Sequence, residues 1–205
     1  MNHKVQSVQT LYDDAMALFK RGVMGSEDTS ADSIIANLGN GINILKGCWE
    51  GKDAGVQINN IVTVFNGMVE VRNALASLAA DSSKIASNYR DIQNSNGAGL
   101  ETLTPVVTED KTKLPEYSDS RDSINITPDA NNGKARVDAA NNAMDGFISN
   151  VRSYYDKIMN NWTVGTGRDR ATAAFETFMS KSQVYKQTLA DVSNSISTAL
   201  KNYSF

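Results

Sequence analysis

The sequence has few of the residues from which most catalytic and metal sites are built. Its 205 residues include one cysteine, Cys48, and one histidine, His3. A single cysteine excludes an intramolecular disulfide, and we interpret Cys48 as a small buried residue. Because His3 is the only histidine, no histidine-rich catalytic or metal site can be assembled. His3 also lies at the N-terminal end, where chains usually fray. We therefore predict a protein that is not an enzyme and uses no metal or cofactor.

The remaining polar motifs do not change that prediction. Carboxylates are plentiful, but the pairs Asp13–Asp14 and Glu109–Asp110 are more typical of a solvated surface than of acid–base chemistry. The segment 165–170, Gly-Thr-Gly-Arg-Asp-Arg, resembles a phosphate-binding loop. It lacks the lysine and the preceding strand that such a loop requires.

Long apolar runs and an excess of positive charge are also absent. No window approaches the ~18 apolar residues that cross a bilayer, and residues 1–6 lack the apolar region of a signal peptide. The formal net charge of −3 offers no basic surface for nucleic acid. We expect no integral membrane segment, no nucleic-acid partner and no classical secretion signal.

Proline is scarce and confined to one part of the chain. Pro105, Pro115 and Pro128 are the only three. Because proline breaks helix interiors, this distribution predicts helices, a linker, then helices. We expect a first helical hairpin with an extra N-terminal helix in residues 1–93, a linker in 94–133 and a second hairpin in 134–205. Within the linker, residues 104–108 and 123–127 are candidates for a pair of short strands.

Apolar residues recur at three- and four-residue steps through both proline-free stretches. The pattern predicts helices over about 3–23, 31–47, 52–92, 134–161 and 168–203. Glycine-bearing segments around Trp49 and Trp162 interrupt it at 47–55 and 160–167, and we predict turns there. The predicted fold class is all-α, with two tandem helical hairpins.

The two halves form an internal repeat when they are overlaid on their tryptophans. With an offset of 113 residues, the predicted core of the first half falls on apolar or aromatic residues of the second. Phe65 falls on Phe178 and Val71 on Val184. Upstream of the tryptophans, the matched hairpin-core positions are Ile34, Leu38, Ile42 and Leu45 with Phe147, Val151, Tyr155 and Ile158. Two such hairpins can bury their apolar stripes against each other in one four-helix bundle.

The turn carries a family resemblance. Trp49-Glu50-Gly51, between an amphipathic helix and a long helix with Phe65, resembles the WXG superfamily of small type VII secretion proteins. The second half departs from the motif, because the glycine after Trp162 comes one residue late, at Gly165. The resemblance implies hairpins that pair as antiparallel four-helix bundles, so the whole chain resembles a fused dimer. It also implies that Trp49, Gly51, Trp162 and Gly165 form the structural turn motifs.

The same resemblance implies a function. We expect a helical interaction protein of type VII secretion, either a secreted substrate or an adaptor or chaperone for an effector. Its partner would be an effector or a component of the secretion apparatus. The family's export tag, a tyrosine followed four residues later by Asp or Glu, is absent from the sequence. The alternative is a helical scaffold of a phage or cell envelope, unrelated to secretion.

The resemblance and the linker also predict location and assembly. We expect a cytoplasmic protein before export, secreted without a signal peptide, and a monomer that contains an internal pseudo-dimer. A linker of about 35 residues can span the length of a helical bundle. We therefore expect the two tryptophan turns to lie at opposite ends of the molecule.

Overall fold

The computed structural model describes residues 7–25, 28–162 and 166–203, of which 77% are helical. The helices are α1 (Val8–Ala17), the π-helical η1 (Leu18–Val23), α2 (Ala31–Cys48), α3 (Lys52–Ser95), α4 (Ala130–Asn161) and α5 (Thr166–Tyr203). Two-residue strands β1 (Trp49–Glu50) and β2 (Asn125–Ile126) complete the described elements. The all-α prediction is confirmed. Within these ranges, no helix combines the length and the apolar content needed to cross a bilayer.

The first helices begin at serine caps. The backbone N–H of Thr10 donates to Ser7 Oγ at 3.3 Å, and that of Ser33 donates to Ser30 Oγ at 3.2 Å. Each serine thus satisfies a backbone donor that the first turn of a helix leaves without a partner. The helix predicted over 3–23 is α-helical only from Val8 to Ala17, then widens into η1, where Met24 N–H donates to Phe19 O. Residues 3–6 of that prediction lie outside the described part of the chain.

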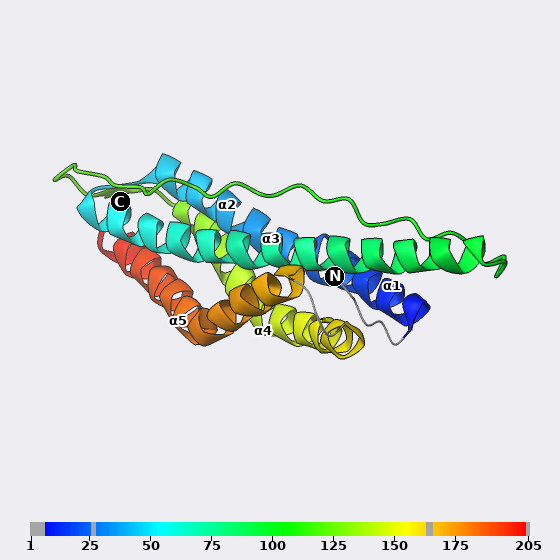
Figure 1. Cartoon of the computed structure of the whole chain (residues 1–205). Helices are drawn as coiled ribbons and strands as arrows, with labels where there is room; N and C mark the ends of the chain where they lie inside the picture. The colour runs from blue at the N-terminus through cyan, green and yellow to red at the C-terminus, as the bar shows by residue number, and fades with distance from the viewer. Residues whose placement is uncertain (1–6, 26–27, 163–165, 204–205) are drawn as a thin grey trace.

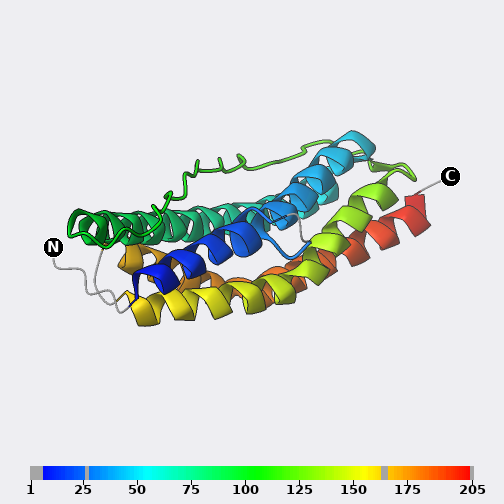
Figure 2. The same cartoon turned by 90° about the vertical axis from the view of Figure 1, so that its right-hand side faces the viewer.

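The helices pack in two antiparallel pairs, each pair joining the two halves of the chain. On α2, Gly41 lies against Gly133 and Val137 of α4, while Asn150 of α4 donates to Thr29, just before α2. On α3, Gly67 lies against Tyr185 of α5, and the first turn of α5 reaches Asp81. The helices therefore lie side by side along an elongated molecule (Figures 1 and 2). Trp49 lies near the C-terminal end of α5, whereas Trp162 follows the C-terminal end of α4. The two tryptophans therefore lie at opposite ends of the molecule.

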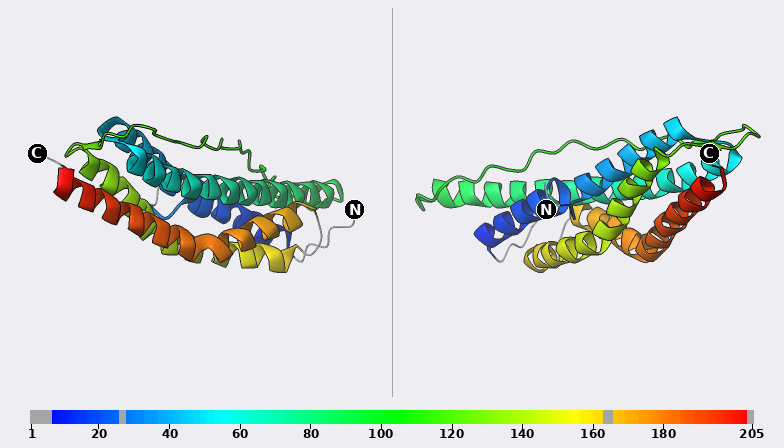
Figure 3. Two further views of the ribbon diagram at one scale, coloured as in Figure 1. Left: turned by 90° about the vertical axis from the view of Figure 1, so that its left-hand side faces the viewer. Right: turned by 180° about the vertical axis from the view of Figure 1, so that it is seen from behind.

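The long helix α3 is the axis of the molecule. Its 44 residues span about 66 Å at 1.5 Å per residue. It contacts α1, α2 and α5, and it supplies many of the buried residues of one continuous core. The segment after α3 turns back and runs along its whole length (Figures 1 and 3). We call residues 100–121 the strap.

The predicted pairing of two strands within the linker is wrong, although β2 lies inside the predicted segment 123–127. Residues 104–108 form no strand, and β2 pairs instead with β1, with Trp49 opposite Ile126 and Glu50 opposite Asn125. The backbone of the first segment is engaged elsewhere. Tyr12 donates its hydroxyl to Thr104 O, and Val106 N–H donates to Ser83 Oγ. Side chains of neighbouring helices thus take the hydrogen bonds that a strand partner would have made.

Candidate functional site: the tryptophan corners and the strap

The two tryptophans end their helices in the same way. Trp49 follows α2 and Trp162 follows α4, each with extended backbone, at φ −135° and ψ 122° and at φ −124° and ψ 107°. Each donates its backbone N–H to the carbonyl four residues earlier, on Leu45 and on Ile158. Those two residues are matched positions of the repeat. Both tryptophan residues are only 2% exposed. We call these two sites the Trp49 corner and the Trp162 corner.

Most of the predicted hairpin core is buried. Both phenylalanines after the corners lie in the core, Phe65 at 8% and Phe178 at 3% exposure. The upstream positions are also fully buried, with Tyr155 as the exception, because it is half-buried and bonds to Thr172 Oγ1 at 2.7 Å. The buried set is Ile34, Leu38, Ile42, Leu45, Phe147, Val151 and Ile158.

The repeat breaks further along the second pair of helices. Val71 is 1% exposed, but its counterpart Val184 is 63% exposed. The inward position belongs to the next residue, Tyr185, whose ring centroid lies 6.1 Å from that of Phe178. Ala79 and Val192 are also matched by the offset of 113 residues, and both are buried. The repeat therefore holds around the corners and at this pair, but not at Val184.

The turn glycine is described at the first corner only. Gly51 has φ +113°, a conformation that side chains with a Cβ rarely adopt. A Cβ there would also lie 2.7 Å from the carbonyl oxygen of Ser123. The chain between the strap and α4 therefore passes directly over this glycine. Gly165, the predicted counterpart, lies outside the described residues.

An ion cluster from the strap closes the Trp49 corner. Gly51 N–H donates to Asp119 Oδ2 at 3.0 Å, and Arg121 reaches both Asp119 and Glu50 at 2.6 Å. Lys52 N–H donates to Arg121 O. Hydrogen bonds from the Arg121 side chain, and then from the backbone N–H groups of Gly51 and Arg121, hold the pKa of Asp119 well below its usual range. The carboxylate form is thus built into the corner.

Three asparagines on α3 bind the strap at regular intervals. Asn66 donates to Leu114 O and accepts from Leu114 N–H, and Asn73 does the same with Lys111. Asn59 accepts from Tyr117 N–H at 3.1 Å. We call these three the asparagine ladder.

The spacing of the ladder has a simple geometric reason. The asparagines are seven residues apart on α3, and their strap partners are three residues apart. Seven residues of helix rise about 10.5 Å, and three residues of extended chain cover about 10 Å. The ladder therefore holds an extended chain in one register through its backbone alone. No prediction from the sequence included this ladder, although Asn59, Asn66 and Asn73 form a visible stripe of asparagines with a period of seven.

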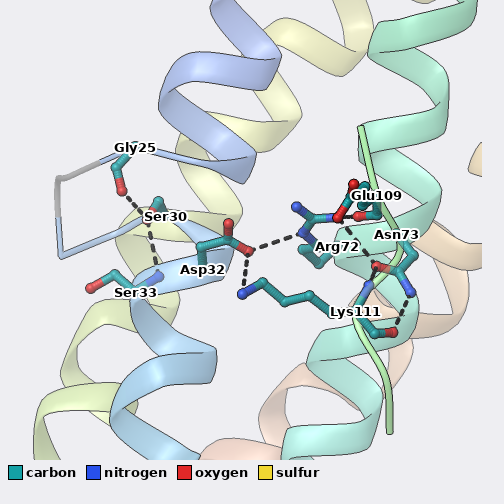
Figure 4. A network of polar contacts seen from close by, with 8 residues as sticks. All are labelled: Gly25, Ser30, Asp32, Ser33, Arg72, Asn73, Glu109 and Lys111. Atoms are coloured by element: carbon teal, nitrogen blue, oxygen red, sulfur yellow. Dashed lines mark hydrogen bonds and ion pairs between the residues drawn. The ribbon is translucent and has the colours of Figure 1, made fainter. Parts of the chain in front are cut away.

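A buried arginine connects the strap to the start of α2 (Figure 4). Arg72 on α3 is only 4% exposed. Its Nε lies 3.0 Å from Asp32 Oδ1, and its Nη1 donates to Glu109 O at 2.6 Å. Lys111 reaches the same Asp32 oxygen at 3.6 Å. Because a buried guanidinium needs its partners, Arg72 holds α2, α3 and the strap together.

No family model, no curated protein and no solved structure matches the chain. In the described ranges, no cluster of three or more His, Cys, Asp or Glu side chains could hold a metal ion. Cys48 is 8% exposed, and burial raises the pKa of its thiol, so it stays protonated and unreactive.

Proposed function

We propose that this protein is a non-enzymatic interaction protein of type VII secretion, built as two WXG-like hairpins fused in tandem. In this proposal the hairpins form an internal pseudo-dimer, an antiparallel four-helix bundle with an extra N-terminal helix. The protein is either a secreted substrate or an adaptor that escorts an effector, and it stays cytoplasmic until export. Its partner is an effector or a component of the secretion apparatus.

The observation that carries the proposal is the shared geometry of the two corners. Trp49 and Trp162 bond to carbonyls at matched repeat positions, and both are buried between two long helices. A WXG-like hairpin needs this arrangement, because a large aromatic plug sets the angle between two helices whose apolar stripes face a second hairpin. The pairing of α2 with α4 and of α3 with α5 supports a second hairpin within the same chain.

The fused arrangement has a consequence for assembly. Each hairpin meets its partner at a high effective concentration, so the chain does not need a second copy to bury its core. We expect light scattering at low micromolar concentration to give the mass of a monomer. An obligate dimer would contradict the internal pseudo-dimer.

Export provides the direct test of the function. The tagged full chain would be produced in its own bacterium, with and without the membrane ATPase that drives type VII secretion. We expect the chain, or a protein that co-purifies with it, to reach the medium only when the ATPase is present. A cytoplasmic enzyme measured in the same medium controls for lysis. If neither the chain nor any co-purifying protein depends on the ATPase, the secretion proposal is wrong and a scaffold role is favoured.

A further inference from the structure

The chain crosses only once between two interlocked parts of the molecule. We call the described residues up to Ser95 the N-terminal unit and those from Leu100 onwards the C-terminal unit. The contacts of α2 with α4, of α3 with α5 and of β1 with β2 all join one unit to the other. The strap belongs to the C-terminal unit and lies on α3 of the N-terminal unit. The same contacts would therefore form if the C-terminal unit came from a second copy.

The single crossing is a turn that is held by its own residues. Gly97 follows the end of α3 with φ +91°, and Gly99 has φ +61°, both in the left-handed region that favours glycine. Gly97 N–H donates to Asn94 O at 2.9 Å. The Asn94 side chain then donates to Leu100 O at 2.8 Å and accepts from Leu100 N–H at 2.7 Å. A few local groups thus set the reversal that returns the strap along α3.

The turn lies at the outer tip of the molecule, where a second copy can approach it (Figure 1). Every residue from 95 to 102 is exposed. Between Ser95 and Leu100 the chain can extend by less than about 20 Å, so two copies that exchanged units would bring their tips together. Ile92 and Leu100 beside the turn are 57% and 43% exposed. Apolar surface therefore lies at the place where the tips of two copies would meet.

The balance between the closed chain and an exchanged dimer depends on the turn and on concentration. Both forms contain the same contacts between units, so these contacts favour neither form. In one chain the two units meet at a high effective concentration, which favours the closed monomer while the turn is unstrained. A change that strains the turn shifts the balance towards exchange and leaves the interface itself intact.

We propose that the turn at residues 94–100 is a hinge through which two copies of this chain exchange their C-terminal units. The partner that fits the interface of α2 with α4 and of α3 with α5 is then a second copy. In the exchanged dimer these pairings form between chains, and the apolar tips pack together. The proposal rests on the fold and not on a role in secretion.

The first test strains the hinge. Gly97→Ala combined with Gly99→Ala places side chains at positive φ, although each new Cβ would meet nothing within 4 Å. A dimer contains two hinges and four strained positions, so its dissociation constant should fall roughly a thousandfold. Light scattering should show a dimer at micromolar concentration for this hinge variant and a monomer for the parent chain. A hinge variant that stays monomeric up to submillimolar concentration would overturn the proposal.

The controls separate the hinge from a general effect of alanine. Gly47→Ala makes the same change inside α2, where its Cβ would also meet nothing within 4 Å, and it should remain monomeric like the parent chain. Circular dichroism should give the hinge variant the helical signal of the parent. Loss of that signal would show that the turn is required for the fold itself, and the hinge proposal would then be wrong.

The second test distinguishes exchange from simple association. Asn150 of the C-terminal unit donates to Thr29 Oγ1 of the N-terminal unit at 3.1 Å. Cysteines at both positions, Thr29→Cys and Asn150→Cys, should form a disulfide within one chain in the closed form and between two chains in the exchanged form. After oxidation, denaturing electrophoresis should give a dimer mass for the hinge variant and a monomer mass for the parent chain. A dimer in light scattering that runs as a monomer after oxidation would mean that two closed copies only touch.

The third test examines the tips in the background of the hinge variant. Ile92→Ser should weaken the dimer about tenfold, because two copies of an apolar side chain lose their buried contact. Val56→Ser is the matched control, since Val56 is 58% exposed near the other end of α3, and it should leave the dimer unchanged. Equal effects of the two substitutions would contradict the meeting of the tips. None of these results bears on ATPase-dependent export, so the two proposals fail separately.

Discussion

The Trp49 and Trp162 corners share an internal geometry and differ in what covers them. Both tryptophans bond to a carbonyl at a matched repeat position and are equally buried. Only the first corner carries a described cover, which includes β2, the Asp119–Arg121–Glu50 cluster and the chain over Gly51. The buried packing of the tryptophan is therefore common to both halves of the chain. The segment that connects the two hairpins makes the two ends of the molecule different.

The largest expected effect comes from removing the shared feature. Trp49→Ala and Trp162→Ala should each lower the free energy of unfolding by about 3–5 kcal/mol, because both side chains fill buried sites. Urea unfolding followed by circular dichroism measures the two variants side by side. An unchanged midpoint for Trp162→Ala would show that the second hairpin is not an equivalent unit.

The next effect separates the covered corner from the helix beside it. Gly51→Ala should cost about 1–3 kcal/mol, since it forces a side chain into positive φ and against Ser123 O. Gly47→Ala is the matched control. Its Cβ would meet nothing within 4 Å in an exposed part of α2, so it should gain about 0.5–1 kcal/mol. If both substitutions have the same sign in thermal unfolding, the cover does not constrain the corner.

A smaller effect tests where the repeat ends. Val71→Ala should cost about 1.6 kcal/mol, since it removes two buried methyl groups. Its repeat counterpart Val184 is exposed, so Val184→Ala should change stability by less than about 0.5 kcal/mol. Equal costs in urea unfolding would place Val184 in the core and contradict the break in the repeat.

The smallest effect is a pH dependence confined to the Trp49 corner. Because the folded state lowers the pKa of Asp119, its contribution is complete above the usual aspartate pKa of about 3.9. That contribution is lost as the pH falls towards the lowered value. The amide signal of Gly51, which donates to Asp119, should therefore keep its folded position at pH ~4 and move only in stronger acid. In Asp119→Asn this acid transition should disappear. A midpoint at the usual aspartate pKa would show that Arg121 does not hold the carboxylate.

Much of the helical fold could be predicted because its signals are local. The steps between Ile34, Leu38, Ile42 and Leu45 predict one buried helix face, and these side chains are buried. The contacts of the strap and the inward position of Tyr185 could not be predicted in this way. A polar stripe such as Asn59, Asn66 and Asn73 has the same pattern whether it faces water or a strap. Val184 and Tyr185 are neighbours that can each bury apolar surface, and only packing against Gly67 and Phe178 decides which one turns inward.

The sequence by itself therefore determined the helices, their breaks and the two tryptophan corners, because hydrophobic period, glycine and proline act within a few residues of themselves. The tertiary structure alone decided the partner of β2, the course of the strap and the inward position of Tyr185. Each of these depends on groups far apart in the chain, such as Asn66 with Leu114 or Gly67 with Tyr185. Backbone hydrogen bonds can be satisfied by any suitable donor or acceptor, so only the packed helices select which one is within reach.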